Sequence, residues 1–563
     1  MKVIIVGGVA GGATAAARIR RLDEHAEITV FERSGYISYA NCRLPYYIGD
    51  VIIDTEELTL QTPESFFKRF RINMKIHHEV ISIHTERKTV SVKNLENGEI
   101  FEENYDKLIL SPGAKPTQPR LPGVGMDKLF TLRTVEDTFR IKEYINKNHP
   151  KSAVLAGGGF IGLELAENLR ELGMDVTIVQ RPKQLMNPFD PDMASMIHNE
   201  MRKHGIKLVL GYTVEGFKEK DNGVEVLLKD NPSLQADMVV LAIGVTPDTA
   251  LAKEAGLELG IKGSIVVNDR METSVPDIYA AGDAVQVKHY VTGDDALISL
   301  AGPANKQGRI IADNICGGDS RYLGSQGSSV IKVFDMTAAT TGINETNAKK
   351  SGLDVDTVIL SPMSHAGYYP GGKVMTMKVV FEKETYRLLG AQIIGYEGVD
   401  KRIDVLATAI HAGLKATQLK DLDLAYAPPY SSAKDPVNMA GFMIDNIAKG
   451  TLKQWHLEDM DKISKDKSVV LLDVRTVGEF NRGHMDGFRN IPVDELRERI
   501  NEIEKGKPVY LICQSGLRSY IASRILEGNG YETYNFSGGF RFYDAVVNDR
   551  ALIERAYACG MDY

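Results

Sequence analysis

The chain has 563 residues, 43% of them hydrophobic and 25% charged, a globular composition with the length of three or four average domains. This excludes a disordered chain, a collagen and a small disulfide-stapled protein. The net charge of −8 gives no sign of nucleic-acid or anionic-lipid binding, so neither nucleic acid nor membrane is expected as a partner.

The first apolar run, residues 1–6, leads directly into Gly7 and Gly8. It is too short for a signal peptide and is typical of a buried strand that begins the fold. No apolar stretch approaches the roughly 18 to 20 residues of a membrane span. Only four cysteines occur in the chain, too few for a disulfide framework. We therefore expect a cytoplasmic protein with reduced thiols and no metal site.

A strand, a glycine-rich turn and a helix open the chain. Gly7, Gly8 and Gly12 lie in the turn, the helix covers 13–22, and a second strand over 27–32 ends in Glu32. Glycines allow the backbone to approach a pyrophosphate, and the start of the helix offers N–H groups to it. Val9 replaces the middle glycine of the usual fingerprint, so this match alone is moderate.

The same arrangement recurs after residue 150. A strand at 152–156 is followed by Gly157, Gly159 and Gly162, with Glu164 just inside the next helix and a further strand at 175–180. One such cluster is also compatible with a simple tight turn. Two units, each with the correct strands and helix, favour two nucleotides bound side by side.

Later segments extend this organisation. The strand 108–110 leads into Ser111 and Gly113, and an apolar strand at 277–281 delivers Asp283, whose plain alternative is a helix N-cap. An α+β stretch begins near 325. Residues 446–462 are polar and without pattern, as in a linker, and a new α/β unit starts near 469.

Two motifs indicate a family. The stretch Ser38-Tyr39-Ala40-Asn41-Cys42-Arg43-Leu44-Pro45-Tyr46 resembles the active-site segment of the coenzyme A-disulfide reductase branch of the flavoprotein disulfide reductases. The segment from about 463 to 550, with the loop Cys513-Gln514-Ser515-Gly516-Leu517-Arg518-Ser519, resembles a rhodanese domain. Together they resemble coenzyme A-disulfide reductase–rhodanese fusions, also described as NAD(P)H-dependent persulfide or polysulfide reductases.

The resemblance implies an α/β fold with two Rossmann-like dinucleotide-binding domains, an α+β dimerisation domain and a C-terminal rhodanese domain. The expected boundaries are 1–115 with 265–322 for FAD, 116–264 for NAD(P)H, 323–445 for dimerisation, 446–462 for the linker and 463–555 for rhodanese. The dimerisation region of a homodimer would complete the partner's active site.

The resemblance also implies cofactors and ligand-binding residues. FAD is expected on Gly7, Gly8, Gly12, Glu32, Ser111, Gly113 and Asp283. NADH or NADPH is expected on Gly157, Gly159, Gly162, Glu164 and Arg181. Coenzyme A is expected on Thr14, Arg21, Ser38, Asn41, Asn305 and Lys434, with Tyr368 and Tyr426 reaching it from the other subunit.

Cys42 is the expected redox cysteine of the reductase. No second cysteine lies near it in the sequence. Cys316, at the end of a helix, is interpreted by default as a small buried thiol. A lone thiol must form a mixed disulfide, a sulfenic acid or a persulfide with something it binds. The phenol groups of Tyr368 and Tyr426 are candidate proton donors to the departing thiolate, although simple interface packing is nearly as good an explanation.

Two positions depart from the family pattern. Arg43 stands where glycine is usual, and its charge favours a thiolate at Cys42, while its bulk equally narrows the approach of substrate or marks an engineered change. Gln180 and Arg181 stand where an NADH-preferring unit carries an acid, which predicts use of NADPH as well as NADH.

Cys513 is the second expected nucleophile. It ends an apolar strand and opens a glycine-containing loop into a helix, so backbone N–H groups and Arg518 would stabilise first a thiolate and then a persulfide. Asp473 and His484 are expected to support the loop rather than to act as acid or base. Cys559 carries no motif.

These features predict an FAD-dependent homodimeric reductase whose substrate is a small persulfide, a polysulfide or coenzyme A disulfide. Electrons would leave through Cys42 with coenzyme A, and Cys513 would collect sulfane sulfur for delivery to it. One alternative is an NADH oxidase or peroxidase that uses a Cys42 sulfenic acid. Its relatives carry a histidine in the first glycine turn, which this chain lacks at Val9-Ala10-Gly11. Another alternative is a flavin and persulfide redox sensor.

Overall fold

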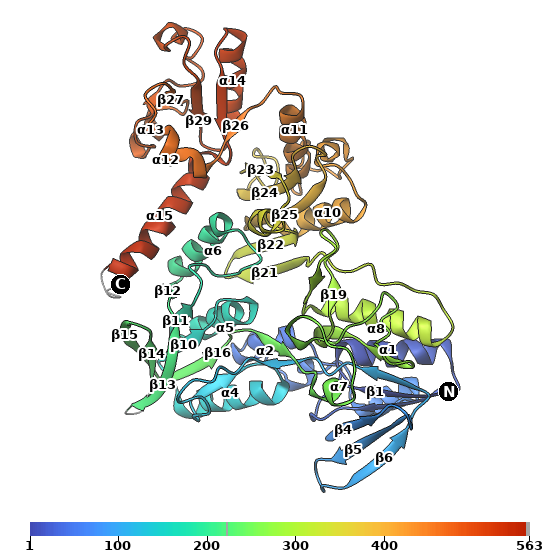
Figure 1. Ribbon diagram of the computed structural model, residues 1–563. Helices are drawn as coiled ribbons and strands as arrows, with labels where there is room; N and C mark the ends of the chain where they lie inside the picture. Colours follow the sequence, from blue (N-terminus) through green and yellow to red (C-terminus); the bar gives the residue numbers. More distant parts are fainter. Residues whose placement is uncertain (221–222, 559–563) are drawn as a thin grey trace. The chain divides into compact units, whose positions relative to one another are not determined.

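The computed structural model describes residues 1–220 and 223–558, in two compact units (Figure 1). The first unit comprises residues 1–183 and 205–327, and the second comprises residues 184–204 and the chain from 328 onward. Cys559, which carried no predicted role, lies outside the described residues. No helix in the described part of the chain combines the length and apolar character needed to cross a bilayer.

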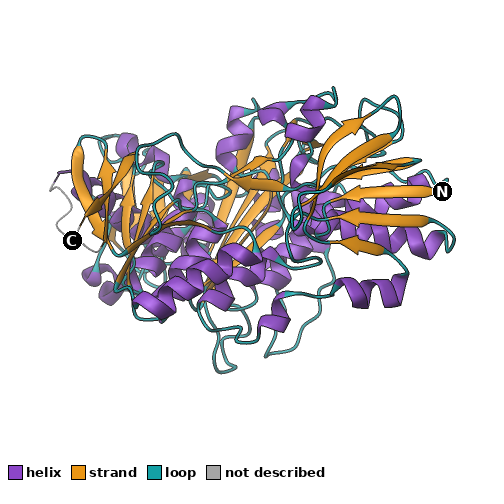
Figure 2. Ribbon diagram, turned by 90° about the horizontal axis from the view of Figure 1, so that it is seen from below, coloured by secondary structure: helices purple, strands orange, loops and turns teal. Residues whose placement is uncertain are grey.

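The first unit begins with a parallel five-stranded sheet. Its spatial order is β18 (Ile278–Ala280), β7 (Lys107–Leu110), β1 (Lys2–Val6), β2 (Glu27–Phe31) and β3 (Asn73–Lys75). Val3, Ile4 and Ile5 are fully buried in a core shared with the helix over 10–22 and with the antiparallel three-stranded sheet over 78–104 (Figure 2). The associated elements are α1 (Ala10–Leu22), α2 (Leu44–Ile48), α3 (Pro63–Phe70), α7 (Ala250–Glu254), α8 (Ala301–Ile315) and the antiparallel β4 (His78–His84), β5 (Thr89–Asn94) and β6 (Ile100–Asn104).

A second parallel sheet repeats this plan within the same unit. Its order is β12 (Lys207–Leu210), β11 (Asp175–Gln180), β10 (Ser152–Ala156), β16 (Met238–Leu241) and β9 (Leu129–Thr131). Helices α4 (Val135–Asn148) and α5 (Phe160–Glu171) accompany it, with the antiparallel β13 (Val214–Lys220), β14 (Gly223–Leu228) and β15 (Asn231–Ala236). Two short pairs complete the unit, β8 (Ala114–Pro116) with β17 (Val245–Pro247) and β19 (Val287–Lys288) with β20 (Asp295–Ala296).

The second unit contains an antiparallel sheet and a parallel one. The antiparallel order is β21 (Ser329–Val333), β22 (Met336–Gly342), β25 (Leu388–Gly395), β24 (Met375–Glu382) and β23 (Val355–Leu360). Its helices are α9 (Glu345–Lys350), α10 (Val399–His411) and α11 (Pro436–Ala448). Every residue of β25 is buried, so this strand forms the centre of the domain core.

The C-terminal parallel sheet has the order β26 (Gln454–Trp455), β30 (Thr533–Phe536), β29 (Val509–Ile512), β27 (Val470–Asp473) and β28 (Arg489–Asn490). Helices α12 (Met460–Ile463), α13 (Val477–Arg482), α14 (Leu517–Gly528) and α15 (Gly539–Ala558) belong to it. The α/β architecture predicted from the sequence, with two dinucleotide-type sheets, an α+β domain and a terminal α/β domain, is confirmed.

The segment 446–462, expected as a linker, contains the edge strand β26 of this sheet. Trp455 is only 2% exposed, packs against Phe536 and donates its indole N–H to the Leu511 carbonyl at 3.2 Å. The segment is polar, and a strand of only two residues is too short to show an alternating pattern. The sequence therefore did not indicate this strand. The predicted domain boundaries stay predictions.

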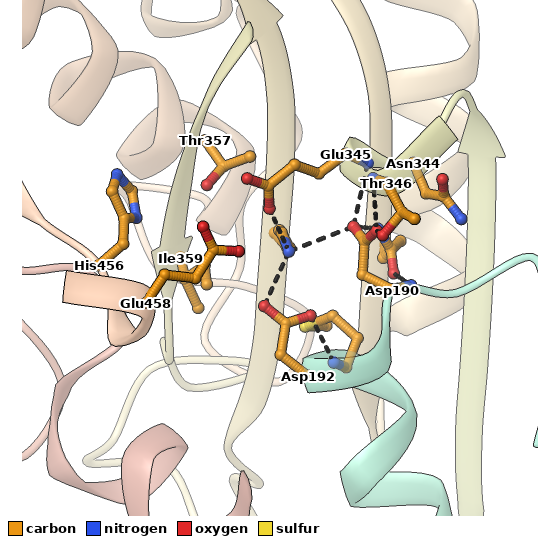
Figure 3. Close-up of polar contacts among 12 residues, drawn as sticks. Asp190, Asp192, Asn344, Glu345, Thr346, Thr357, Ile359, His456 and Glu458 are labelled. Atoms are coloured by element: carbon orange, nitrogen blue, oxygen red, sulfur yellow. Dashed lines mark hydrogen bonds and ion pairs between the residues drawn. The ribbon is translucent and has the colours of Figure 1, made fainter. Parts of the chain in front are cut away.

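The segment 184–204 leaves the second dinucleotide sheet and packs within the second unit, where α6 (Pro191–Lys203) lies. The ammonium group of Lys378, 1% exposed on β24, lies 3.2 Å from Asp190, 2.8 Å from Asp192 and 2.7 Å from Glu345 (Figure 3). Asp190 also accepts hydrogen bonds from Thr346 and Gln392. Because Lys378 on β24 is paired with Asp192 on α6, this buried charge cluster holds α6 against the antiparallel sheet.

Contacts at β23 and α6 hold the C-terminal domain within the unit. The Ile359 N–H donates to the Ser537 hydroxyl at 3.0 Å, and His456 lies 3.1 Å from Asp356. The backbone N–H of Leu185, which precedes α6, donates at 2.9 Å to Nε2 of His198 on that helix, so the proton of the neutral imidazole is on Nδ1. That Nδ1 lies 2.8 Å from Asp549 on α15, and Arg202 lies 2.5 Å from the same carboxylate.

Replacing Asp549 with alanine would leave His198 and Arg202 without their shared acceptor. Both His198 and Asp549 are almost completely buried, so we expect a loss of about 3–5 kcal/mol, measured as a lower midpoint of thermal or denaturant unfolding. Asp544→Ala, an exposed carboxylate on the same helix, is the matched control. Equal midpoints for the two variants would contradict the anchoring role.

The same pair has a defined pH dependence. Burial of the Asp549 carboxyl opposes its ionisation, but the hydrogen bonds from His198 and Arg202 and the charge of Arg202 prevail and lower its pKa. The stabilisation is therefore complete above the ordinary carboxyl pKa of 3.8 and is lost as the pH falls through the lower folded-state value. The gap between wild type and Asp549→Ala should close over that acidic range.

Candidate active sites

The first glycine turn, expected to bind FAD, contains an acceptor for its own backbone. The Glu32 carboxylate, 8% exposed, accepts from the Gly8 N–H at 2.8 Å and from the Ser34 N–H at 2.9 Å. A Cβ on Gly12 would lie 1.9 Å from the Gly7 carbonyl oxygen, so only glycine permits this close approach. No side chain caps the start of α1. Its N–H groups are therefore available to a pyrophosphate, and these residues fit a bound dinucleotide.

The other predicted FAD residues lie on neighbouring strands. Ser111 follows β7, donates its backbone N–H to Val6 and precedes Gly113, whose φ is +70°. Asp283 follows β18, beside β7, and forms a 2.5 Å ion pair with Arg133. The Arg133 carbonyl in turn accepts a hydrogen bond from Asn41 at 3.1 Å. Sequence analysis missed Arg133, because its spacing from Asp283 carries no signal.

The second glycine turn, expected to bind NAD(P)H, has the same geometry with a different acceptor. Gln180 accepts from the Gly158 N–H at 3.1 Å, as Glu32 does from Gly8. A Cβ on Gly162 would lie 2.2 Å from the Gly157 carbonyl oxygen, whereas one on Gly159 would meet nothing within 4 Å. The start of α5 therefore opens onto free space that fits a phosphate group. Arg181 is exposed at the end of β11.

Cys42 lies at the centre of a short 3-10 turn over 41–43, directly before α2. It is exposed and unpaired, and the other described cysteines, Cys316 and Cys513, are also free thiols. The Arg43 guanidinium donates to the Glu57 carbonyl, which ties the turn to the 55–58 segment. Ser38 donates its backbone N–H to Gly8, so the Cys42 segment starts beside the first glycine turn.

Helix α2 rests on α5 of the second dinucleotide domain. A Cβ on Gly49 would lie 2.0 Å from the Asn168 side-chain oxygen, so the two helices touch here. Burial, together with the charges of Glu164, Glu167 and Cys42, raises the pKa of Tyr46 to about 12. Burial and the charge of Glu167 raise the pKa of Glu164 to about 7. A half-buried carboxyl with a pKa near neutrality thus lies close to the segment that carries Cys42.

A basic groove of about 270 Å³ lies between α1 and α8. Three residues predicted to bind coenzyme A line it, namely Thr14, Arg21 and Asn305, and Thr14 donates to Asn305 at 2.8 Å. Arg18, Lys306 and Arg309 also line it and were missed. Their three- and four-residue helical spacing was the available signal. Four cations around one groove suit a ligand with phosphate groups.

Tyr368, Tyr426 and Lys434 belong to the second unit, whereas Cys42 and the basic groove belong to the first. The two phenol oxygens lie 2.6 Å apart, and both side chains are exposed. Their hydrogen bond raises the pKa of Tyr426. The buried Arg402, which sequence analysis missed, holds the bases of both loops through hydrogen bonds to the Ser364 carbonyl and to Asp435. Lys434 is exposed beside Asp435.

The Cys513 loop is the most completely assembled of these sites. Cys513 follows β29 and is 1% exposed, and its Sγ accepts from the Gly516 N–H and from the Ser519 hydroxyl, each at 3.1 Å. Arg518 forms two 2.7 Å hydrogen bonds with Glu479. The Arg518 hydrogen bonds lower the pKa of Glu479 to about 2. The Gly516 N–H and the Ser519 hydroxyl suit a sulfur anion. Ser519 was not singled out in the sequence, and the expected role of Arg518 stays a prediction.

Asp473 and His484 have structural contacts. Asp473 is fully buried in a 2.6 Å ion pair with Arg475, whose guanidinium lies over the Phe540 ring. The His484 ring stacks on the Phe480 ring, with 3.9 Å between the ring centroids, and its Nδ1 lies 3.1 Å from the Phe480 carbonyl oxygen. These contacts are compatible with the expected supporting role, which stays a prediction.

Replacing Ser519 with alanine removes one of the two donors to Cys513 Sγ. One hydrogen bond to a charged group is worth about 1.5–3 kcal/mol, so alkylation of Cys513 by iodoacetamide at neutral pH should slow about tenfold or more. Ser523→Ala is the control, because Ser523 is buried on the same helix but donates to the Tyr520 carbonyl instead. Unchanged reactivity in Ser519→Ala would mean that Gly516 alone holds the thiolate.

Comparisons with known proteins agree with this architecture. Residues 1–308 match the pyridine nucleotide-disulphide oxidoreductase family, 328–436 match the dimerisation domain of that family, and 456–545 match the rhodanese-like domain. The chain therefore belongs to the pyridine nucleotide-disulphide oxidoreductases, with a rhodanese-like domain after the dimerisation domain. The predicted family resemblance is confirmed, as is the prediction of an oxidoreductase that binds FAD and a pyridine nucleotide.

Relatives narrow the class further. The coenzyme A disulfide reductase of Staphylococcus aureus strain JH9 is 39% identical over 443 residues, which is 78% of this chain and 99% of that protein. The structure of reduced Bacillus anthracis CoADR-RHD is 48% identical, covers 98% of each chain and has a TM-score of 0.95. The NAD-dependent persulfide reductase from A. fulgidus is 39% identical over 96% of this chain and all of that one, with a TM-score of 0.90. The roles assigned to individual site residues stay predictions.

Proposed function

We propose that this enzyme is a homodimeric NAD(P)H-dependent reductase of small persulfides, polysulfides or coenzyme A disulfide, acting through the single thiol of Cys42. The observation that supports this proposal most directly is that Cys42 is exposed and unpaired in a unit that also contains two dinucleotide-type glycine turns. FAD, when bound, supplies the two-electron chemistry. A thiol without a neighbouring cysteine needs a partner thiol to complete its redox cycle, and coenzyme A is that partner in this proposal.

The basic groove between α1 and α8 supports coenzyme A as this partner. Arg18, Arg21, Lys306 and Arg309 provide the positive charge that phosphate groups require. Asn41, next to Cys42, is hydrogen-bonded to the carbonyl of Arg133, so the segment that carries the thiol has a defined position. The named activities of the coenzyme A disulfide reductase and persulfide reductase relatives point to the same chemistry.

In this proposal the two cysteines have different tasks. Cys513, buried and held by two hydrogen-bond donors, accepts a sulfane sulfur atom and keeps it as a persulfide anion. Cys42, exposed, forms a mixed disulfide with coenzyme A. The exposed phenols of Tyr368 and Tyr426 give a proton to the departing thiolate.

Separate substitutions of the two cysteines test the division. Cys42→Ser should lower NAD(P)H oxidation with coenzyme A disulfide by at least about a thousandfold, because it removes the nucleophile, while sulfur transfer from thiosulfate to Cys513 persists. Cys513→Ser should retain reduction of coenzyme A disulfide and lose turnover of persulfides and polysulfides. The assay is anaerobic NAD(P)H oxidation with the three acceptors in parallel. If Cys513→Ser turns over every acceptor normally, the transfer between the cysteines is wrong.

Ionisation of Glu164 should weaken binding of NAD(P)H. Because the carboxyl has a pKa of about 7 and follows the glycine turn of α5, it adds negative charge near the expected pyrophosphate position as the pH rises. Affinity should fall about three- to tenfold between pH 6 and 8 in the wild type and stay level in Glu164→Gln, measured by fluorescence titration. Glu171→Gln, exposed at the end of α5, is the control. Parallel profiles for wild type and Glu164→Gln would refute this coupling.

A further inference from the structure

Glu479 joins helix α13 to the Cys513 loop. Its carboxylate accepts from the backbone N–H and from the hydroxyl of Thr476, each at 2.9 Å, which caps the start of α13. Both of its oxygens also accept from Arg518, which follows Gly516 by two residues. One carboxylate thus holds the end of a helix and the single cation of the sequence 513–519 at the same time.

The ion pair between Arg518 and Glu479 stays charged at neutral pH. Its two hydrogen bonds, each 2.7 Å long, make a bidentate contact, which is the strong form of such a pair. The Arg518 hydrogen bonds lower the pKa of Glu479 to about 2, so the carboxylate is ionised. Because the two side chains are only 31% and 21% exposed, water screens their charges only in part.

Arg518 interacts with Cys513 through its charge. Among the described residues, Cys513 Sγ accepts from the Gly516 N–H and from the Ser519 hydroxyl, each at 3.1 Å, and both of these donors are uncharged. The hydrogen bonds and the charge of Glu479 raise the pKa of Arg518, and the charge of Cys513 adds to that rise. Glu479 therefore offsets a positive charge that would otherwise act on the sulfur atom and on its donor.

A second guanidinium beside the loop is matched in the same way. Arg475, 1% exposed, lies 3.4 Å from the Gln514 side-chain oxygen and forms a 2.6 Å ion pair with the buried Asp473. Arg541 contacts the loop through its backbone N–H, which donates to the Gln514 carbonyl at 3.2 Å, and its side chain is exposed, where water and salt screen its charge. The surroundings of the Cys513 sulfur thus combine uncharged hydrogen-bond donors with cations that are already paired or screened.

Compounds that donate sulfane sulfur differ in charge. Thiosulfate is a dianion, whereas an organic persulfide R–S–SH is neutral, or a monoanion when its terminal sulfur is ionised. Attack of a thiolate on an anionic donor meets charge repulsion, which an unmatched cation near the sulfur would reduce. Because the charge of Arg518 is matched, this help is weak, and the loss is greatest for the dianion.

We propose that Glu479 determines the donor specificity of the Cys513 site. By matching the charge of Arg518, it favours transfer from organic persulfides over transfer from dianionic donors such as thiosulfate. Since it acts through Arg518, it is a positioning residue and not a catalytic one. The inference rests on the proposed function of Cys513 as an acceptor of sulfane sulfur.

Both transfers need no outside oxidant or reductant. The Cys513 thiolate attacks the terminal sulfur of R–S–SH, a new S–S bond forms at Cys513, and the S–S bond of the donor breaks with its electron pair on R–S⁻. The proton of the terminal sulfur passes to R–S⁻, which departs as R–SH. With thiosulfate, the same attack on the outer sulfur releases sulfite, which takes the electron pair. Cys513 is left as a persulfide anion in each case.

The test measures single-turnover persulfidation of Cys513 by mass spectrometry in full-length Cys42→Ser protein. The donors are thiosulfate and N-acetylcysteamine persulfide, which has no charged group other than its sulfur. Glu479→Gln keeps an acceptor for Thr476 and Arg518 and removes the negative charge. We expect this variant to raise the rate constant with thiosulfate, relative to that with the persulfide, by about tenfold.

Two further variants complete a cycle. Arg518→Gln leaves the charge of Glu479 unmatched and should lower the thiosulfate rate relative to the persulfide rate. The double variant removes both charges and should return this ratio to within about twofold of the starting protein. Glu498→Gln removes an exposed carboxylate of the same domain, and as the matched control it should leave both rates within about twofold.

A structural role of Glu479 would lower both rates by the same factor in Glu479→Gln, and that result, or an unchanged ratio, would overturn the proposal. If Glu479→Gln does not fold, an unchanged ratio in Arg518→Gln overturns it instead. Absence of Cys513 persulfidation with either donor in the Cys42→Ser protein would overturn the proposed function of Cys513. The two failures are therefore distinct.

Discussion

The buried carboxylate of Asp549 joins two helices whose paired residues are 351 positions apart in the chain. Together with the Lys378 cluster and the Ser537 contact, it makes α6, the antiparallel sheet and the C-terminal sheet one compact unit. Opening this unit would expose charges that have no other partner, which is costly. Cys513 is therefore held in a fixed framework formed by one compact unit.

Local patterns in the sequence predicted the parts that depend on local physics. Strand, glycine turn and helix follow one another in both dinucleotide domains, so spacing alone marked Glu32 and Gly12 as candidate dinucleotide-binding residues. Cys513 was found because its strand–loop–helix context is also local. The two-residue strand at Trp455 escaped because its partner β30 is about 80 residues later in the chain. The pairing of His198 with Asp549 has no sequence signal, since neither residue is unusual in its own helix.

The residues expected to bind coenzyme A show the same limit of prediction from local sequence. Thr14, Arg21 and Asn305 were assigned through family resemblance, and the structure brings them into one groove with three further cations that helical periodicity would have revealed. Arg133 and Arg402 act through carbonyl and carboxylate contacts to distant segments, which only a structure reveals. Arg43 departs from the family pattern, and its hydrogen bond to the Glu57 carbonyl shows how the Cys42 turn accommodates a large side chain.

The contact between Gly49 and Asn168 constrains how this enzyme can evolve. Any side chain at position 49 collides with the amide at position 168, so a change at one position demands a smaller residue at the other. The two positions lie beside different sheets, one a few residues after Cys42 and the other on the helix that follows the second glycine turn. Exchange of either domain for that of a distant relative would therefore bring mismatched surfaces together at this point, even when both domains fold.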